Sequence, residues 1–246
     1  MKIKPIPRLK LPTLLAVLGL SLAGSALRAA DSGHWYAGAL STNQGGQLYF
    51  DWTPTGFAGL DAAHGFTYSM NYSNSGTYAG LFNIGNPTMT ALAQTTANGG
   101  TPSANAAAFG SFIELSIVSV TGPAGGSLYF FSNSISPTFT LASGSTASSD
   151  IFQLSFGDSS AGPGADPYGH IHGRRWAVDL PGTYTVGVEL FDGGHNGIGG
   201  GPIQAPSDIY YINFLAVPEP STAALGLLGV MLGTVGLPFL RRKRRT

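Results

Sequence analysis

Two apolar stretches without charge, each joined to a cluster of basic residues, limit which part of this chain can form a globular fold. Residues 11–27 follow a basic leader at residues 1–10, and residues 221–240 precede five consecutive basic residues. Roughly 190 residues remain between these ends, which suits one domain. The globular fold is therefore expected within residues 31–216.

The two ends have the organisation of export and membrane signals. A basic start, an apolar middle and small residues such as Gly24 and Ala26 follow one another as in a secretory signal peptide. Residues 221–240 would span roughly 30 Å as a helix, about the thickness of the hydrocarbon core. The basic cluster behind them is expected to stay in the cytoplasm, with the rest of the chain outside. We predict a signal peptide at residues 1–30, with an uncleaved anchor as the alternative, and a transmembrane helix at 221–240.

The charge of the middle region is strongly one-sided. Between Asp31 and Pro220, two arginines stand against all twelve acidic residues of the chain, which leaves a net charge of −10 and no lysine. Such a surface repels phosphate backbones, so nucleic acid is excluded as a partner, whereas cations are attracted. The chain also has no cysteine, so an exported domain must be stable without disulfide bonds and cannot use thiolate ligands.

Short alternating or aromatic-rich runs, separated by Gly, Ser, Asn and Pro, predict an all-β fold for residues 31–216. Their spacing favours an antiparallel β-sandwich. A tight turn at Pro181-Gly182 predicts that the strands on either side of it form a hairpin. The predicted loop at residues 85–108 is long enough to divide the region, so one or two subdomains remain open. The expected strands are residues 34–41, 47–53, 66–72, 77–84, 112–120, 128–132, 138–141, 151–156, 171–180, 183–191 and 209–215.

A three-residue motif stands directly before the apolar helix: Pro218, Glu219 and Pro220. This motif, the helix and the arginine-rich cluster together resemble the PEP-CTERM sorting signal of Gram-negative bacteria that make extracellular polysaccharide. The resemblance covers residues 217–246. It implies recognition by an exosortase, removal of the helix near the motif, and release or attachment at the cell surface. An ordinary membrane-anchored ectodomain is the alternative.

The sequence Gly169-His170-Ile171-His172 suggests a metal site. Alternate residues of a strand point to the same face, so His170 and His172 would project together. Imidazole and carboxylate ligands suit zinc or a similar divalent ion. His195 follows on the loop after the expected partner strand and is the third ligand in our prediction. Sequence alone does not rank it against the other candidates, His34, His64, Asp166 and Asp192. Ordinary hydrogen bonding of both histidines is the alternative.

A second resemblance covers roughly residues 112–192. Residues 112–123 look like the entry to the bacterial surface-anchored domain known as choice-of-anchor M. The family's G-x-H-x-H-x-x-W segment and P-G-x-Y-T strand are matched by Gly169, His170, His172 and Trp176, and by residues 181–185. The pair Arg174-Arg175 departs from the smaller residues usual before the tryptophan. The resemblance implies an accessory or binding role at the surface, with metal as the ligand, because some members accompany predicted metal-type transporters.

Aromatic residues offer a further kind of binding site. A carbohydrate-binding or matrix module, with extracellular polysaccharide as its partner, would stack sugars on exposed rings from Trp35, Tyr36, Trp52, Tyr68 and Tyr72. By contrast, Trp176 and Tyr184 are expected in the core. Arg174 and Arg175 are expected to pair with carboxylates such as Asp179 or Glu189.

No catalytic constellation stands out. Residues 157–163 resemble the nucleophile loop of chymotrypsin-like serine proteases, and residues 62–64 resemble their histidine segment. However, Ser160 and Ala161 replace the paired glycines that follow the serine in that family. We therefore predict a non-enzymatic protein.

Overall fold

The computed structural model describes residues 34–51, 66–96, 99–132, 135–146, 151–156, 162–170 and 174–218, and these residues form an almost entirely β structure. The predicted signal peptide and transmembrane helix lie outside the described residues. Within the described part of the chain, no helix is long and apolar enough to cross a membrane. The predicted all-β class is confirmed.

The described residues form thirteen strands and one short 3₁₀ helix. In chain order they are β1 (His34–Ala39), β2 (Leu48–Asp51), β3 (Phe66–Tyr72), η2 (Gly76–Tyr78), β4 (Phe82–Ile84), β5 (Thr88–Ala91), β6 (Ile113–Thr121), β7 (Ser127–Ser132), β8 (Phe139–Ala142), β9 (Ile151–Gln153), β10 (Gly169–His170), β11 (Arg174–Val178), β12 (Gly182–Asp192) and β13 (Tyr210–Ala216).

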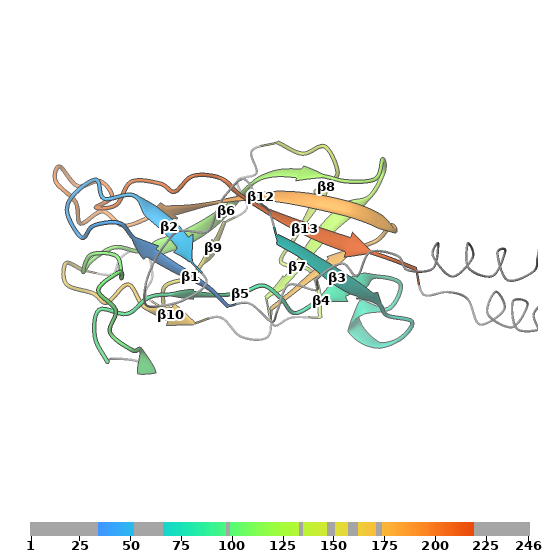
Figure 1. Cartoon of the computed structure of the whole chain (residues 1–246), viewed down its shortest axis with the longest axis horizontal. Coiled ribbons are helices and arrows are strands. Elements are labelled where there is room, and N and C mark those ends of the chain that lie inside the picture. Colours follow the sequence, from blue (N-terminus) through green and yellow to red (C-terminus); the bar gives the residue numbers. More distant parts are fainter. Residues whose placement is uncertain are drawn as a thin grey trace, which may run out of the picture.

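The strands form two sheets (Figure 1). The smaller sheet has the order β10-β5-β1-β2, and a curled nine-stranded sheet has the order β8-β7-β11-β4-β3-β13-β12-β6-β9. The smaller sheet lies at one end of the molecule, beside β6, β9 and β12 (Figure 1). Most neighbouring strands are antiparallel, but β1 pairs with β5 and β13 with β3 in parallel. The architecture is therefore sandwich-like and mixed, where a purely antiparallel arrangement was expected.

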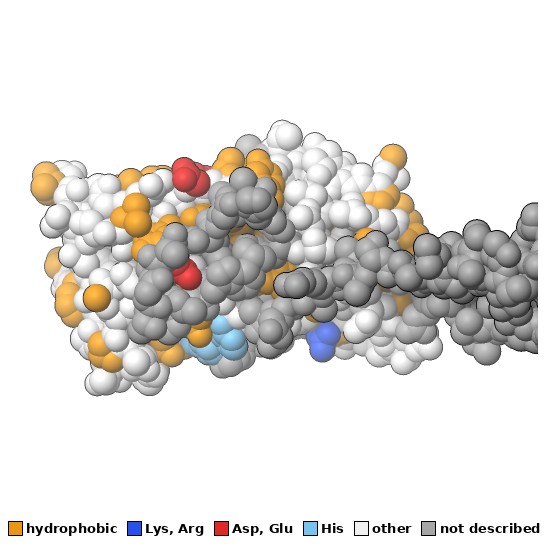
Figure 2. All heavy atoms as spheres, in the orientation of Figure 1, with side chains coloured by type: hydrophobic (Ala, Val, Ile, Leu, Met, Phe, Trp, Pro, Cys, Tyr) orange, Lys and Arg blue, Asp and Glu red, His pale blue; other side chains and the backbone are white. Residues whose placement is uncertain are grey.

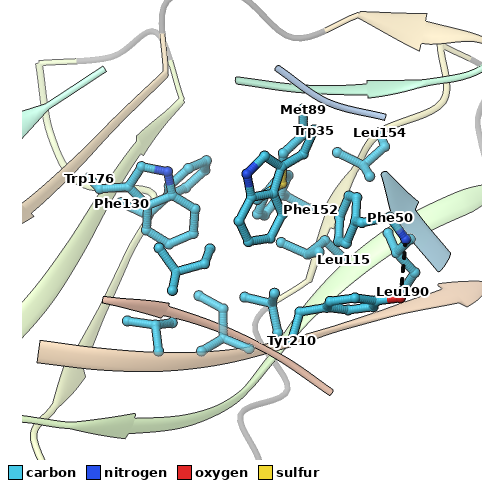
Figure 3. Close-up of a cluster of buried hydrophobic side chains, with 14 of the residues drawn as sticks. Trp35, Phe50, Met89, Leu115, Phe130, Phe152, Leu154, Trp176, Leu190 and Tyr210 are labelled. Carbon is cyan, nitrogen blue, oxygen red and sulfur yellow. Dashed lines mark hydrogen bonds between the residues drawn. The ribbon is translucent and has the colours of Figure 1, made fainter. Parts of the chain in front are cut away.

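The hydrophobic core is one continuous cluster of buried side chains that come from both sheets. Trp35, Phe50 and Met89 enter it from the smaller sheet, and Leu115 and Leu190 enter from the larger one (Figure 3). The Tyr210 hydroxyl oxygen accepts a hydrogen bond from the Phe50 amide at 3.4 Å. Each fully buried large side chain contributes about 1.5–3 kcal/mol. The strands alternate buried and more exposed residues because only one face meets this core.

Two predicted core residues are confirmed and one predicted pairing is wrong. Trp176 is 1% exposed and Tyr184 is fully buried. The Pro181-Gly182 turn, however, does not close a hairpin: β11 pairs with β7 and β4, whereas β12 pairs with β6 and β13. The chain crosses here between separate parts of the curled sheet. Gly182 has φ 138°, and a Cβ on it would lie 2.6 Å from the Pro123 ring, so this crossing requires glycine.

The segment 85–108, expected as a loop, contains a strand. Its residues Thr88–Ala91 form β5, which lies between β1 and β10 in the smaller sheet. The buried cluster includes residues before, within and after this segment, among them Trp35, Met89 and Leu115. Because β5 pairs with β1 on one side and with β10 on the other, these two strands lie close together in the smaller sheet.

Candidate functional site

The structure brings two of the five histidines together on one face of the smaller sheet. His34 begins β1 and His170 ends β10, and both strands flank β5. The two imidazole rings stack with their centroids 5.7 Å apart and their planes 19° apart. Tyr36 continues the row, with its ring centroid 6.1 Å from that of His34. Figure 2 shows histidine side chains gathered at the surface near the start of β1. We call His34 and His170 the histidine pair.

One ring nitrogen of His170 is held by the strand between the two histidines. Thr90 of β5 lies opposite His170 in the sheet, and its Oγ1 is 2.6 Å from His170 Nδ1. A hydrogen bond at one imidazole nitrogen orients the ring, and a metal ion would bind through the other nitrogen. The pair therefore has the chemistry of a two-histidine metal site. Within the described residues, no group of three or more His, Asp or Glu could hold a metal ion.

The other predicted ligands have different surroundings. His195 is exposed on the loop after β12 and forms no metal-holding group with the histidine pair. His172 and His64 lie outside the described residues. The candidate that the structure places beside His170 is therefore His34, which sequence could not rank.

Asp166 lies in the loop that precedes β10, and both oxygens of its carboxylate already accept hydrogen bonds from the protein. Its Oδ1 accepts hydrogen bonds from the backbone amides of Gln94 and Tyr168, both at 3.0 Å. Its Oδ2 accepts from the Thr95 amide at 2.7 Å and from the Thr95 hydroxyl. Burial alone raises the pKa of Asp166, but these hydrogen bonds outweigh burial and hold the pKa below its ordinary value. Asp166 therefore fastens two loops together.

Asp192 has the same kind of role at the end of β12. Its two oxygens accept hydrogen bonds from four backbone amides, at 2.8–3.1 Å: Phe112, Gly194, Ile203 and Gln204. Glu114 lies nearby on β6, and its pKa is raised by burial and then by repulsion from Asp192. Because its oxygens are already used by the backbone, Asp192 organises the loops after β12 and is not placed as a metal ligand.

The predicted aromatic platform is wrong for two of its members. Trp35 is fully buried and Tyr68 is 2% exposed, and Trp35 Nε1 donates to the Tyr68 hydroxyl at 3.0 Å. Both belong to the core, because bulky rings on the inner face of a sheet satisfy their polar atoms with each other. Tyr36 is half-buried beside the histidine pair and Tyr72 is 46% exposed. Trp52 lies outside the described residues.

The predicted ion pairs of the two arginines are also absent from the described residues. Arg174 lies over the rings of Phe152 and Phe130, and Arg175 lies over the ring of Tyr78. Asp179, the expected partner, accepts hydrogen bonds from the Ser127 amide at 2.8 Å and the Tyr129 hydroxyl at 3.1 Å. Stacking on aromatic rings replaces ion pairing for both cations.

Comparisons with protein-family models, with curated proteins and with solved structures find no match to this chain. The resemblances to the PEP-CTERM signal and to the choice-of-anchor M domain therefore stay sequence-based predictions. The residues that carry the first, Glu219 and Pro220, lie outside the described residues, as do His64 and Ser159 of the protease-like segments.

Proposed function

We propose that this chain is an exported surface or extracellular-matrix protein of a Gram-negative bacterium, sorted by an exosortase through its Pro-Glu-Pro tail, with a non-enzymatic binding or structural role. The observation that carries the proposal is the order of three parts: Pro218 to Pro220, an uncharged stretch at 221–240, and the basic cluster behind it. The basic cluster supports it, because Lys and Arg residues that directly follow an apolar helix stay in the cytoplasm and leave the preceding region on the other side.

Replacement of the motif tests the sorting step. With Pro218, Glu219 and Pro220 all changed to alanine, the chain is expected to reach the membrane, keep its tail and lose surface display. Intact-mass analysis of membrane and surface fractions measures both effects. The matched control changes Ser221 and Thr222, the next two residues, to alanine and should be processed normally. Unchanged processing of the motif variant would contradict the sorting proposal.

A divalent metal ion is the second candidate, and the histidine pair favours it. Two imidazoles share one sheet face, and Thr90 holds one of them in orientation. Each Zn–N bond is about 2.0–2.1 Å, so the two rings would turn towards each other to share one ion. His172, which we predicted as a ligand together with His170, lies outside the described residues. The net charge of the region would also attract a cation.

Thermal unfolding with and without zinc tests the metal site. The full-length protein in detergent is expected to gain about 2.7 kcal/mol of stability when zinc reaches a hundred times its dissociation constant. This gain should disappear in His34→Ala and in His170→Ala and persist in His195→Ala, the control for an exposed histidine. An equal gain in the unaltered protein and in all three variants would show that the histidine pair does not bind the zinc. No gain in any of them would contradict a metal site.

A further inference from the structure

Arg174 lies at the rim of the core, where a charged side chain is least expected. It begins β11 and shares the inward face of that strand with Trp176, two residues later. Its guanidinium carbon is 5.0 Å from the ring centroid of Phe152 and 6.0 Å from that of Phe130. Aromatic faces attract a cation but do not neutralise it.

The charge of Arg174 has no counter-ion among the described residues. Nη1 makes a long hydrogen bond of 3.4 Å to the Gln153 carbonyl, and the buried Nε has no hydrogen-bond partner there. Burial lowers the pKa of Arg174 to about 10. A buried cation is costly unless an anion accompanies it, and buried donors almost always find acceptors. The side chain therefore has an unmet requirement for a negatively charged acceptor.

A small pocket opens beside this guanidinium. It has a volume of about 250 Å³, including the part open to solvent, and Arg174 shares its lining with Met89, Phe130, Phe152 and Trp176. The lining combines one cation with apolar and aromatic walls, as in sites that bind the charged group of an otherwise uncharged molecule. The enclosed part of this space is only about the size of one water molecule, so one oxygen of a carboxylate could enter it and the rest of a ligand would lie in solvent.

The neighbouring arginine, Arg175, has different surroundings from Arg174. Arg175 points to the other face of β11, lies 5.1 Å from the ring centroid of Tyr78, and donates from Nη1 to the Asn83 side-chain oxygen at 2.8 Å. A polar partner within the protein therefore satisfies Arg175. Among the described residues, the one hydrogen-bond partner of the Arg174 side chain is the Gln153 carbonyl, at 3.4 Å.

We propose that the Arg174 pocket binds the carboxylate of an extracellular ligand, with the guanidinium donating to its oxygens at the mouth of the pocket and the body of the ligand lying outside it. The net charge of −10 around the site favours ligands with a single negative charge over dense polyanions. Two sources supply such a group: a uronic acid residue in a mostly neutral polysaccharide, and the terminal carboxylate of a peptide. Neither His34 nor His170 is among the residues that line this pocket.

Tryptophan fluorescence of the full-length protein in detergent tests this proposal, because Trp176 lines the pocket. The probes are methyl glucuronoside, its uncharged methyl ester, and N-acetyl-alanyl-alanine. Saturable quenching or enhancement is expected with at least one of the two acids and not with the ester. The acid that binds more tightly identifies the source of the carboxylate. No saturable response to either acid, or an equal response to acid and ester, overturns the proposal without the need for any variant.

Two matched variants locate the site. Arg174→Gln is expected to weaken binding of the responding acid by about tenfold or more, because a bidentate charged hydrogen bond is lost. Arg175→Gln removes the same charge from the adjacent residue and should retain binding within about twofold, because its effect is limited to screened long-range attraction. Equal loss in both variants would mean general electrostatic attraction and would contradict a defined pocket. Melting temperatures recorded in parallel verify that both variants are folded.

Discussion

Asp166 and Glu114 are carboxylates of opposite character, and the difference arises from their hydrogen-bond partners. Asp166 accepts from three backbone amides and one hydroxyl, which hold its pKa below the ordinary value although burial acts in the other direction. Glu114 is shifted the other way by burial and by Asp192. Asp166 therefore stabilises the fold as an anion, and Glu114 stabilises it better when protonated.

Asp166→Asn is expected to destabilise the protein by roughly 1–3 kcal/mol at neutral pH, because the amide nitrogen would face donors of Thr95 or Gln94 that now have an acceptor. The corresponding fall in Tm is about 2–12 °C. A lowered pKa contributes stability that is present above the unfolded value of 3.8 and is lost as pH falls through the folded value. The difference in Tm between Asp166→Asn and the unaltered protein should therefore become smaller in acid. Melting curves between neutral pH and pH 3 measure it, and a difference independent of pH would contradict this role.

Glu114→Gln is expected to stabilise the protein at neutral pH, whereas Asp166→Asn destabilises it. A raised pKa means that the stability contributed by the protonated group is complete below the unfolded value of 4.5 and is lost as pH rises through the folded value. The glutamine variant should therefore melt about 1–2 °C higher than the unaltered protein at neutral pH and similarly to it below pH 4.5. Melting curves over this range measure the effect. A variant that melts lower at neutral pH would show that the Glu114 charge is stabilising.

At the residue scale, the sequence showed which side chains could bind a metal ion or accept hydrogen bonds, but it did not show which residues would lie beside them. Asp166 and Asp192 carry the oxygen atoms that a metal would need, but backbone amides distant in sequence already occupy them. His34 was one of several unranked ligands, and its neighbour His170 is separated from it by a strand that sequence did not predict. A side chain's partners depend on the sheet order, which local patterns do not specify.

At the element scale, the central strands were predicted well and the pairings poorly. β6, β12 and β13 alternate buried and less buried residues over most of their length, so their period is visible in the sequence. β5 was missed because Thr88–Ala91 is only four residues long and lies among Asn, Pro and Gly residues. The Pro181-Gly182 turn suggested a hairpin. A turn reverses the direction of the chain, but it does not determine which strands become hydrogen-bonded neighbours in the sheet.

The position of β10 depends on a glycine, which gives a test of the smaller sheet. A Cβ on Gly169 would lie 1.6 Å from the Leu154 carbonyl oxygen, a backbone atom that cannot move aside. Gly169→Ala is therefore expected to cost about 3 kcal/mol or more and to displace β10 from β5. Chemical denaturation of the full-length protein in detergent measures the cost.

Gly162→Ala is the matched control for this substitution. It precedes β10 in the same connection, and nothing lies within 4 Å of the position that its Cβ would take. Its stability should stay within about 1 kcal/mol of the unaltered protein, since the substitution acts mainly on the unfolded chain. Equal effects of the two substitutions would mean that Leu154 does not approach Gly169 as closely as the structure places it.

At the scale of the whole molecule, charge is divided between the ends and the middle. The basic residues lie beside the two apolar stretches, except for Arg174 and Arg175, and all acidic residues lie between those stretches. The two arginines lie over aromatic rings, so the β-domain depends on its continuous core and on backbone-bound carboxylates such as Asp192. The uncharged stretch after Pro220 and the basic cluster behind it are the features that favour a membrane step.

The location and mass of the protein in the cells that produce it test this account most directly. Cells are separated into cytosolic, membrane and surface fractions, and the intact mass of the chain is measured in each. The account predicts a chain outside the cytosol that has lost its N-terminal signal peptide and, in the surface fraction, its apolar tail. A full-length chain of 25.3 kDa dissolved in the cytosol would contradict it.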